Sequence, residues 1–193
     1  ACGNNHKELA LALVEVGAEL EAKNNNQRTP LMHACDYGHK DLALALIEKG
    51  AELEAEDNAG NTPLMRACMQ GHRELALALI EKGAELEAKD MAGSTPLIVA
   101  CKSGHKELSM ELIEKGAELE AKDYGGTPLM WACSRGYKEL ALALIEKGAE
   151  LEAKDNGGNT PLMWACMQGH KELALALIGK GAELEVKNKA GHT

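Results

Sequence analysis

The chain has 193 residues, of which 45% are hydrophobic and only 3% are aromatic, with no Phe. Its core must therefore be built from small and aliphatic side chains, which favours closely packed helices over a β-sandwich. The net charge is -9, with Lys and Arg interleaved among Glu, and this argues against a nucleic-acid partner. No apolar run reaches the roughly 18 residues of a membrane span, and no signal peptide is visible. We expect a cytoplasmic chain in a reducing environment, without a membrane partner.

A tripeptide, Thr-Pro-Leu, recurs along the chain at a nearly fixed interval. It begins at Thr29, Thr62, Thr95, Thr127 and Thr160, in steps of 33, 33, 32 and 33 residues. A fixed period of this size indicates a repeat architecture. The sequence predicts one domain over residues 1–193, with a partial repeat 1–23, full repeats 24–56, 57–89, 90–122, 123–154 and 155–187, and a partial repeat 188–193.

Each full repeat contains the signals for two helices and a turn. In the second full repeat, Thr62 is a good N-cap and Pro63 suits the first helical position, so a short helix begins there and ends near Gly71. A second helix is predicted over 72–82, and Gly83 supplies a left-handed C-cap. The following segment has no helical period, and its end, "DNAG", is typical of a tight turn.

The repeated sequence resembles the ankyrin repeat family over essentially the whole chain. The matching motifs are D-x-x-G-x-T-P-L, A-x-x-x-G-H and G-A-x-L-x-A, with five copies in register. Tetratricopeptide repeats have a similar period but lack the turn segment and the Thr-Pro-Leu start. The resemblance implies an all-α ankyrin-repeat solenoid of stacked helix-turn-helix units, with β-turn or hairpin fingers.

The repeats depart from the family pattern in three ways. The family usually has His after Thr-Pro-Leu, and any hydrogen-bond role of that His is in doubt here. The residues at that position are Met32, Met65, Ile98, Met130 and Met163. The turn that starts at Asp123 is one residue short, and Gln27 stands where the first turn should have Gly. We expect these two turns to differ in shape from the others.

Variation between repeats is concentrated on the first helix and the turn. By contrast, the block from Glu74 to Asp90 is identical to the block from Glu139 to Asp155. Within the first helix the varying positions are spaced i, i+3 and i+4, so they share one face. The candidate protein-binding residues are His33, Asp36, Tyr37, Asn58, Arg66, Met69, Gln70, Met91, Val99, Lys102, Ser103, Tyr124, Trp131, Ser134, Arg135, Asn156, Trp164, Met167 and Gln168.

Stacked repeats would place these faces side by side, about 10 Å apart, and so form a concave groove roughly 50 Å long. In the resembled family this groove and the turn tips beside it bind other proteins. Trp, Tyr, Met and Arg at the varying positions suit such a role, although Trp131 and Trp164 could also be packing residues. We expect a non-catalytic protein-binding module, in the form of a designed or selected repeat scaffold. The alternatives are a spacer segment of a larger natural ankyrin protein, or a stability scaffold with no partner.

The residues that look chemical recur at fixed repeat positions, which argues for structural roles. Neighbouring cysteines should lie a helix-packing distance apart, too far for a disulfide, so we expect them to be small buried hydrophobes. They are Cys35, Cys68, Cys101, Cys133 and Cys166, whereas Cys2 at the chain end should oxidise most readily.

Histidines and glutamates also recur without converging on a reaction centre. A ladder of His39, His72, His105 and His170 is interrupted by Tyr137, which cannot replace a catalytic imidazole. We expect these residues to be structural at the helix junction, and pairs such as Glu85 and Glu87 to be solvated. The sequence predicts no enzyme, no cofactor and no metal site.

A further apolar position lies on the second helix, away from its main apolar stripe. It is occupied by Leu44, Leu77, Met110, Leu142 and Leu175. These residues would either widen the core between repeats or form an apolar stripe that promotes self-association. We expect a monomer, with weak self-association as the alternative.

Overall fold

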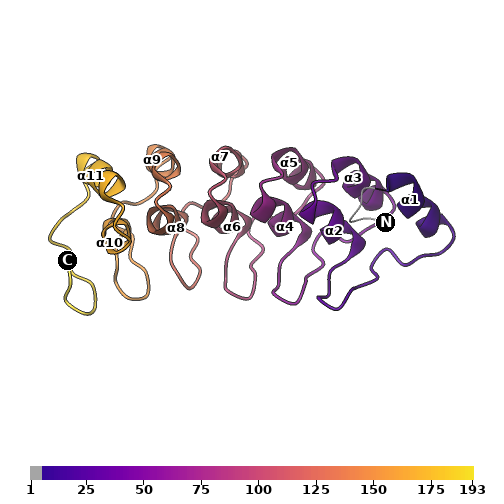
Figure 1. Ribbon diagram of the computed structural model, residues 1–193, viewed down its shortest axis with the longest axis horizontal. Helices are drawn as coiled ribbons and strands as arrows, with labels where there is room; N and C mark the ends of the chain where they lie inside the picture. Colours follow the sequence, from indigo (N-terminus) through magenta and orange to yellow (C-terminus); the bar gives the residue numbers. More distant parts are fainter. Residues whose placement is uncertain (1–5) are drawn as a thin grey trace. The chain divides into compact units, whose positions relative to one another are not determined.

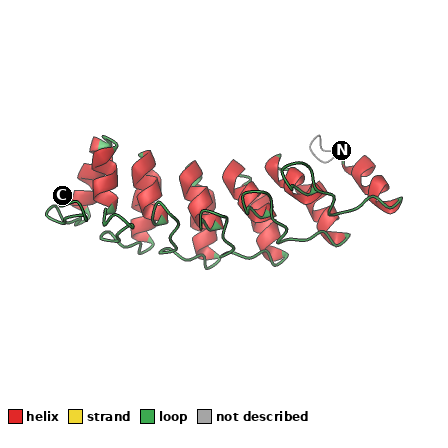
Figure 2. Cartoon of the chain, turned by 90° about the horizontal axis from the view of Figure 1, so that it is seen from below, coloured by secondary structure: helices red, strands yellow, loops and turns green. Residues whose placement is uncertain are grey.

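The computed structural model describes residues 6–193, and this part of the chain consists of helices and loops without a named strand (Figure 2). The all-α repeat architecture predicted from the sequence is confirmed. The chain forms two compact units, residues 1–91 and 92–193, which we call the N-terminal unit and the C-terminal unit. Cys2 lies outside the described residues.

The N-terminal unit contains two complete helix pairs and one additional second helix. Its helices are α1 (Lys7–Glu15), α2 (Pro30–Asp36), α3 (Lys40–Glu48), α4 (Pro63–Gln70) and α5 (Arg73–Glu81). Helix α2 packs on α4, and α3 packs on both α1 and α5. Figure 1 shows α1, α3 and α5 in one row and α2 and α4 in another, with the turns projecting on the side of α2 and α4. This arrangement places the turns next to the first helices.

The C-terminal unit repeats the same arrangement with three helix pairs. Its helices are α6 (Pro96–Ser103), α7 (Lys106–Glu114), α8 (Pro128–Arg135), α9 (Lys138–Glu146), α10 (Pro161–Met167) and α11 (Lys171–Gly179). The first helices α6, α8 and α10 pack in series, and α7, α9 and α11 do likewise. We refer to α3, α5, α7, α9 and α11 as the outer helices. Among the described residues, no helix combines the length and apolar character needed to cross a membrane.

The first helix of every full repeat begins at a Thr cap. In α4 the Thr62 hydroxyl accepts a hydrogen bond from the Met65 N–H at 3.3 Å, and Pro63 occupies the first turn. The cap satisfies one of the N–H groups that have no intrahelical partner. At the other end Gly71 adopts a left-handed conformation, with φ of 75°, and terminates the helix. These features confirm the predicted start and end of this helix.

The core lies between the two rows of helices and is aliphatic. In the second full repeat α4 packs on α5, and Leu64, Met65, Leu75 and Leu79 of these helices are all buried. The position after Thr-Pro-Leu is buried in every full repeat. The Met or Ile found there is therefore a core residue.

The first turn keeps the shape of its neighbours although it lacks Gly. The Asn24 N–H donates to the Arg28 carbonyl at 3.1 Å, as the Asp57 N–H does to Asn61. Gln27 itself adopts the left-handed conformation, with φ of 58°. Our expectation of a different shape is wrong here, because the surrounding hydrogen bonds hold Gln27 in a conformation that side chains disfavour.

The shortened turn, in contrast, differs as predicted. Asp123 and Gly126 exchange two backbone hydrogen bonds, of 3.2 and 3.3 Å, and form an isolated bridge. Gly126 has a φ of 116°, a region that L side chains rarely adopt. The missing residue thus gives a tighter loop at the tip of this repeat.

Candidate functional site

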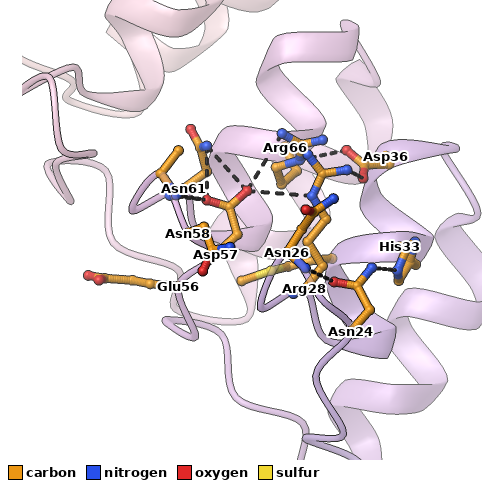
Figure 3. Close-up of polar contacts among 12 residues, drawn as sticks. Asn24, Asn26, Arg28, His33, Asp36, Glu56, Asp57, Asn58, Asn61 and Arg66 are labelled. Carbon is orange, nitrogen blue, oxygen red and sulfur yellow. Dashed lines mark hydrogen bonds and ion pairs between the residues drawn. The ribbon is translucent and has the colours of Figure 1, made fainter.

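In the second full repeat, Arg66 in the middle of the first helix forms an ion pair with the turn of its own repeat. Arg66 is only 7% exposed, and its Nε lies 2.6 Å from Asp36 Oδ1 (Figure 3). Its Nη1 lies 3.7 Å from Asp57 Oδ2, in the turn that precedes α4. The guanidinium therefore links a turn to two first helices of the N-terminal unit. Arg66, which the sequence places among the candidate protein-binding residues, is thus buried and paired within the chain.

Arg28 completes an ion cluster around the same two carboxylates. It lies 3.3 Å from Asp36 Oδ2 and 3.6 Å from Asp57 Oδ2, so two cations face two anions (Figure 3). Burial alone would raise the pKa of Asp57. Hydrogen bonds from the Asn61 and Ala59 N–H groups, the Asn61 side chain and the Arg66 charge together hold that pKa below its usual range.

Trp131 makes the equivalent link in the C-terminal unit. Its indole N–H donates to Asp123 Oδ1 at 2.9 Å, and Lys102 Nζ lies 2.6 Å from Asp123 Oδ2. The same Nζ stands 4.4 Å from the centre of the Trp131 ring, a cation–π contact. A Cβ on Gly125 would collide with this ring. The shortened turn and Trp131 are therefore fitted to each other.

The link recurs in two other repeats with different chemical groups. The Trp164 indole donates to Asp155 Oδ2 at 3.1 Å, and the His33 Nε2 lies 2.9 Å from the Asn24 amide nitrogen. Val99, at the equivalent position of the middle repeat, is buried and has no polar group to contribute. We call His33, Arg66, Trp131 and Trp164 the clamp residues.

The clamp explains why a cation and a large aromatic can occupy one position. Arg66 and Trp164 both present an N–H to the turn carboxylate of their own repeat. A signal for this was present in the sequence, since the clamp residue follows the first Asp or Asn of its turn by nine residues, or by eight after the shortened turn. The sequence left open that Trp131 and Trp164 are packing residues, and their bonds to the turn carboxylates agree with that alternative.

The remaining predicted contact residues divide by exposure. Met91 and Tyr124, at 71% and 77%, are among the most exposed large apolar side chains, and Tyr37 and Met167 are also more than half exposed. The other exposed candidates are Asn58, Gln70, Arg135, Asn156 and Gln168. The half-buried candidates outside the clamp are Asp36, Met69, Lys102, Ser103 and Ser134. We call the exposed candidates the tip residues, because they lie on the turns or at the carboxyl ends of first helices.

Backbone hydrogen bonds tie neighbouring turns together within each unit. In the N-terminal unit, the Asn58 N–H donates to Asn26 and the Met91 N–H to Ala59, both at 3.0 Å. In the C-terminal unit, the Tyr124 N–H donates to the Ala92 carbonyl at 3.3 Å. Asn58, Met91 and Tyr124 are therefore held on hydrogen-bonded turns, which reduces the entropy lost on binding.

The predicted chemistry of the cysteines holds for four of the five described positions. Cys35, Cys68, Cys101 and Cys133 are buried as free thiols. Burial raises the pKa of Cys101 and of Cys133 to about 12, so these thiols stay protonated. Cys166 is exposed, which corrects our expectation, because no further helix covers α10 on that side among the described residues.

Two of the histidines have the expected structural role at the helix junction. The His72 Nε2 lies 3.1 Å from the Asp36 carbonyl, and the His170 Nε2 lies at the same distance from the Ser134 carbonyl. Each imidazole thus satisfies a carbonyl at the end of the preceding first helix. Tyr137 packs closely against Gly104 at the corresponding place, because a Cβ on Gly104 would lie 2.8 Å from the Tyr137 ring.

We expected the glutamate pairs to be solvated, but the second residue of several pairs accepts a hydrogen bond. The second residue of a pair accepts a hydrogen bond from the next repeat, as Glu54 does from the Glu85 N–H and Glu120 from the Glu150 N–H, both at 2.9 Å. Burial raises the pKa of Glu54 and of Glu120, against the opposing effect of these hydrogen bonds. Glu85 is exposed, whereas Glu87 is half-buried. The ladder therefore connects extended segments of successive repeats.

Comparison with known proteins identifies the repeat by sequence. A family model of ankyrin repeats, in three copies, matches residues 1–90 and 87–155. A model of the single ankyrin repeat matches residues 157–189. A search of curated proteins gave no match. Within the described residues, no group of three or more His, Cys, Asp or Glu side chains could hold a metal ion.

Proposed function

Because the chain belongs to the ankyrin repeat family, a family of protein-interaction modules, we propose that it is a non-catalytic module that binds another protein through its tip residues. The clamp residues would hold the turns, and the tip residues would contact the partner. We further propose that the repeats form a designed or selected scaffold. The near-verbatim copies, with differences concentrated at a few positions, support this origin.

The exposure of large side chains among the tip residues carries the binding proposal. Tyr37 and Met91 in the N-terminal unit, and Tyr124 and Met167 in the C-terminal unit, expose most of their surface. Apolar surface of this kind gains free energy when a partner covers it and removes it from water. Tyr, Met and Arg are also enriched at the centres of protein interfaces. Arg135, exposed at the end of α8, adds a cation to this set.

The partner can be sought by affinity capture followed by a variant comparison. The immobilised chain and a Tyr124→Ser, Met167→Ser variant would be exposed to the same lysate, after circular dichroism has shown that both are folded. Proteins held by the first and lost by the second would be purified and titrated. We expect their affinity for the variant to fall about tenfold or more, as for the loss of interface anchors.

A matched control separates contact from general surface effects. Glu146→Gln changes an exposed residue on outer helix α9, away from the turns. This control should retain every captured protein. If the tip variant and the control bind each captured protein equally, the tip residues are not the binding surface.

One observation favours the alternative of a scaffold without a partner. The indole N–H groups of Trp131 and Trp164 are both used within the chain. Their presence can therefore be explained by turn stability alone. Under this alternative, removal of Tyr124 and Met167 would have no binding phenotype, and no partner would be captured by the unchanged protein.

A further inference from the structure

The outer helices of the N-terminal unit expose part of an apolar row. Leu44 of α3 and Leu77 of α5 are half-buried, so they contribute to the core and also reach the surface. Together with Ala78 they line a shallow cavity of about 310 Å³ between the two helices. Lys40 and Glu74 stand at its rim, joined by an ion pair of 3.4 Å. This position is compatible both with a wider core between repeats and with an apolar stripe that promotes self-association.

Charged residues flank each of these leucines in a regular order. In α3, Lys40 precedes Leu44 by four residues and Glu48 follows it by four. In α5, Arg73 and Glu81 flank Leu77 in the same way. Residues four apart lie on one face of a helix. Helices α3 and α5 therefore each present a row that reads cation, leucine, anion from the N-terminal end.

This order is self-complementary when two such faces meet in antiparallel orientation. A two-fold axis through the leucines would place Leu44 on Leu44 and Leu77 on Leu77 of a second copy. It would also bring Lys40 opposite Glu48, and Arg73 opposite Glu81, in each direction. A dimer of this kind uses the same patch on both copies, and antiparallel helices also have opposed dipoles.

The net charge of the chain does not oppose contact at this face. Together with their C-cap lysines, α3 and α5 carry four cations and four anions, although the whole chain has a charge of -9. These residues are Lys40, Lys49, Arg73, Lys82, Asp41, Glu48, Glu74 and Glu81. Like chains can therefore approach here with little repulsion.

We propose that the face formed by Lys40, Leu44, Glu48, Arg73, Leu77 and Glu81 binds the same face of a second copy of this chain. This outer Leu face lies on helices other than those that carry the tip residues. The proposal is therefore independent of the proposed partner. In the C-terminal unit α9 carries the same row, Lys138, Leu142 and Glu146, but it has no matching neighbour, because α11 has Gly179 in place of the anion and α7 has Glu111 where α5 has Ala78. A carboxylate at that place is costly to bury.

Sedimentation equilibrium of the full chain over a range of concentrations tests the proposal. The unchanged protein should show a reversible dimer. Leu77→Lys should weaken it by about tenfold or more, because each dimer loses two apolar contacts. Leu142→Lys, the same change on α9, is the matched control and should leave the association unchanged. A monomer at every concentration up to about 1 mM, or an equal loss in both variants, would overturn the proposal.

Charge reversal gives a second test with exposed residues, which does not depend on a leucine that also packs in the core. A variant with Glu48→Lys and Glu81→Lys should be monomeric, because like charges would then face each other. Adding Lys40→Glu and Arg73→Glu should restore the dimer. Failure of the fourfold variant to associate, while the unchanged protein does, would show that this antiparallel register is wrong.

Discussion

The indole N–H of Trp131 donates to Asp123 Oδ1 at 2.9 Å, and this bond closes the shortened turn onto helix α8. The same carboxylate accepts hydrogen bonds from the Gly125 and Gly126 N–H groups. Its second oxygen lies near Lys102 and Ser94. Asp123 thus orients a turn tip, Trp131 and Lys102. Trp131, whose position varies between repeats, therefore contributes to the structure of its own repeat.

Trp131→Phe should destabilise the chain by about 1 kcal/mol, the value of one hydrogen bond between side chains. An aromatic ring is kept, although it is smaller than the indole, and Asp123 loses one donor. Trp131→Ala should cost about 3 kcal/mol, because the packing of the ring is lost as well. Urea unfolding followed by circular dichroism measures both values. Equal stability of the Phe variant and the unchanged protein would show that the hydrogen bond contributes nothing.

Gln27→Gly should stabilise the chain by about 1 kcal/mol, because Gln27 has a positive φ that disfavours side chains. The reciprocal change, Gly60→Ala, should destabilise it, since a Cβ there would lie 2.9 Å from the Met91 nitrogen. The midpoints of urea unfolding should move in opposite directions for the two variants. A loss of stability in Gln27→Gly would contradict our description of the first turn.

Arg66→Met should cost about 3 kcal/mol, because it leaves two partly buried carboxylates with one cation fewer. Asp36→Asn added to this variant should recover part of the loss. A double-mutant cycle measured by urea unfolding gives the coupling between the two residues. Additive effects of the two changes would mean that the 2.6 Å contact does not couple them.

Stability should fall in acid as the turn aspartates are protonated. Burial opposes ionisation of Asp57, Asp123 and Asp155, but their hydrogen bonds outweigh it and lower each pKa below the usual 3.8. Their contribution is therefore complete above pH 3.8 and is lost as the pH falls through the lower folded values. The unfolding free energy, measured between pH 5 and pH 2, should decrease less when all three are changed to Asn. An unchanged slope would refute the assignment.

Glu54 and Glu120 should act in the opposite direction. Each has a folded pKa raised above the usual 4.5 by burial. Protonation therefore favours the folded chain, and stability from these groups increases as the pH falls through the raised values towards 4.5. Glu54→Gln with Glu120→Gln should remove this increase while keeping an acceptor for each backbone N–H. If the variant shows the same rise in stability between pH 7 and 4.5, other groups cause it.

The sequence was sufficient to predict the helices because their signals are local. The Thr62 cap, Pro63 and the Gly71 terminus lie within one short segment. The interval between Thr-Pro-Leu copies then implied stacking, since a single repeat cannot bury its own apolar face. Gln27 shows the limit of local rules, because neighbouring hydrogen bonds impose a conformation that its residue type disfavours.

The polar contacts between repeats were not predictable in the same way. Arg66 and Asp36 are 30 residues apart, and Glu54 and Glu85 are 31 apart, so their pairing depends on how successive repeats stack. Composition and period give the stacking but not the side-chain directions. A packing role for Trp131 and Trp164 could be anticipated from the sequence, but the bonds of the clamp residues to the turns could not, although every clamp residue carries an N–H or a ring nitrogen.

The division between clamp and tip residues is tested most directly by comparing two double variants against one captured partner. Trp131→Phe with Trp164→Phe removes two clamp hydrogen bonds, and Tyr124→Ser with Met167→Ser removes exposed contacts. Calorimetric titration should show a loss of about tenfold or more for the tip variant and a smaller loss for the clamp variant. A larger loss for the clamp variant, with both variants equally folded, would contradict this account and return the Trp side chains to the binding surface.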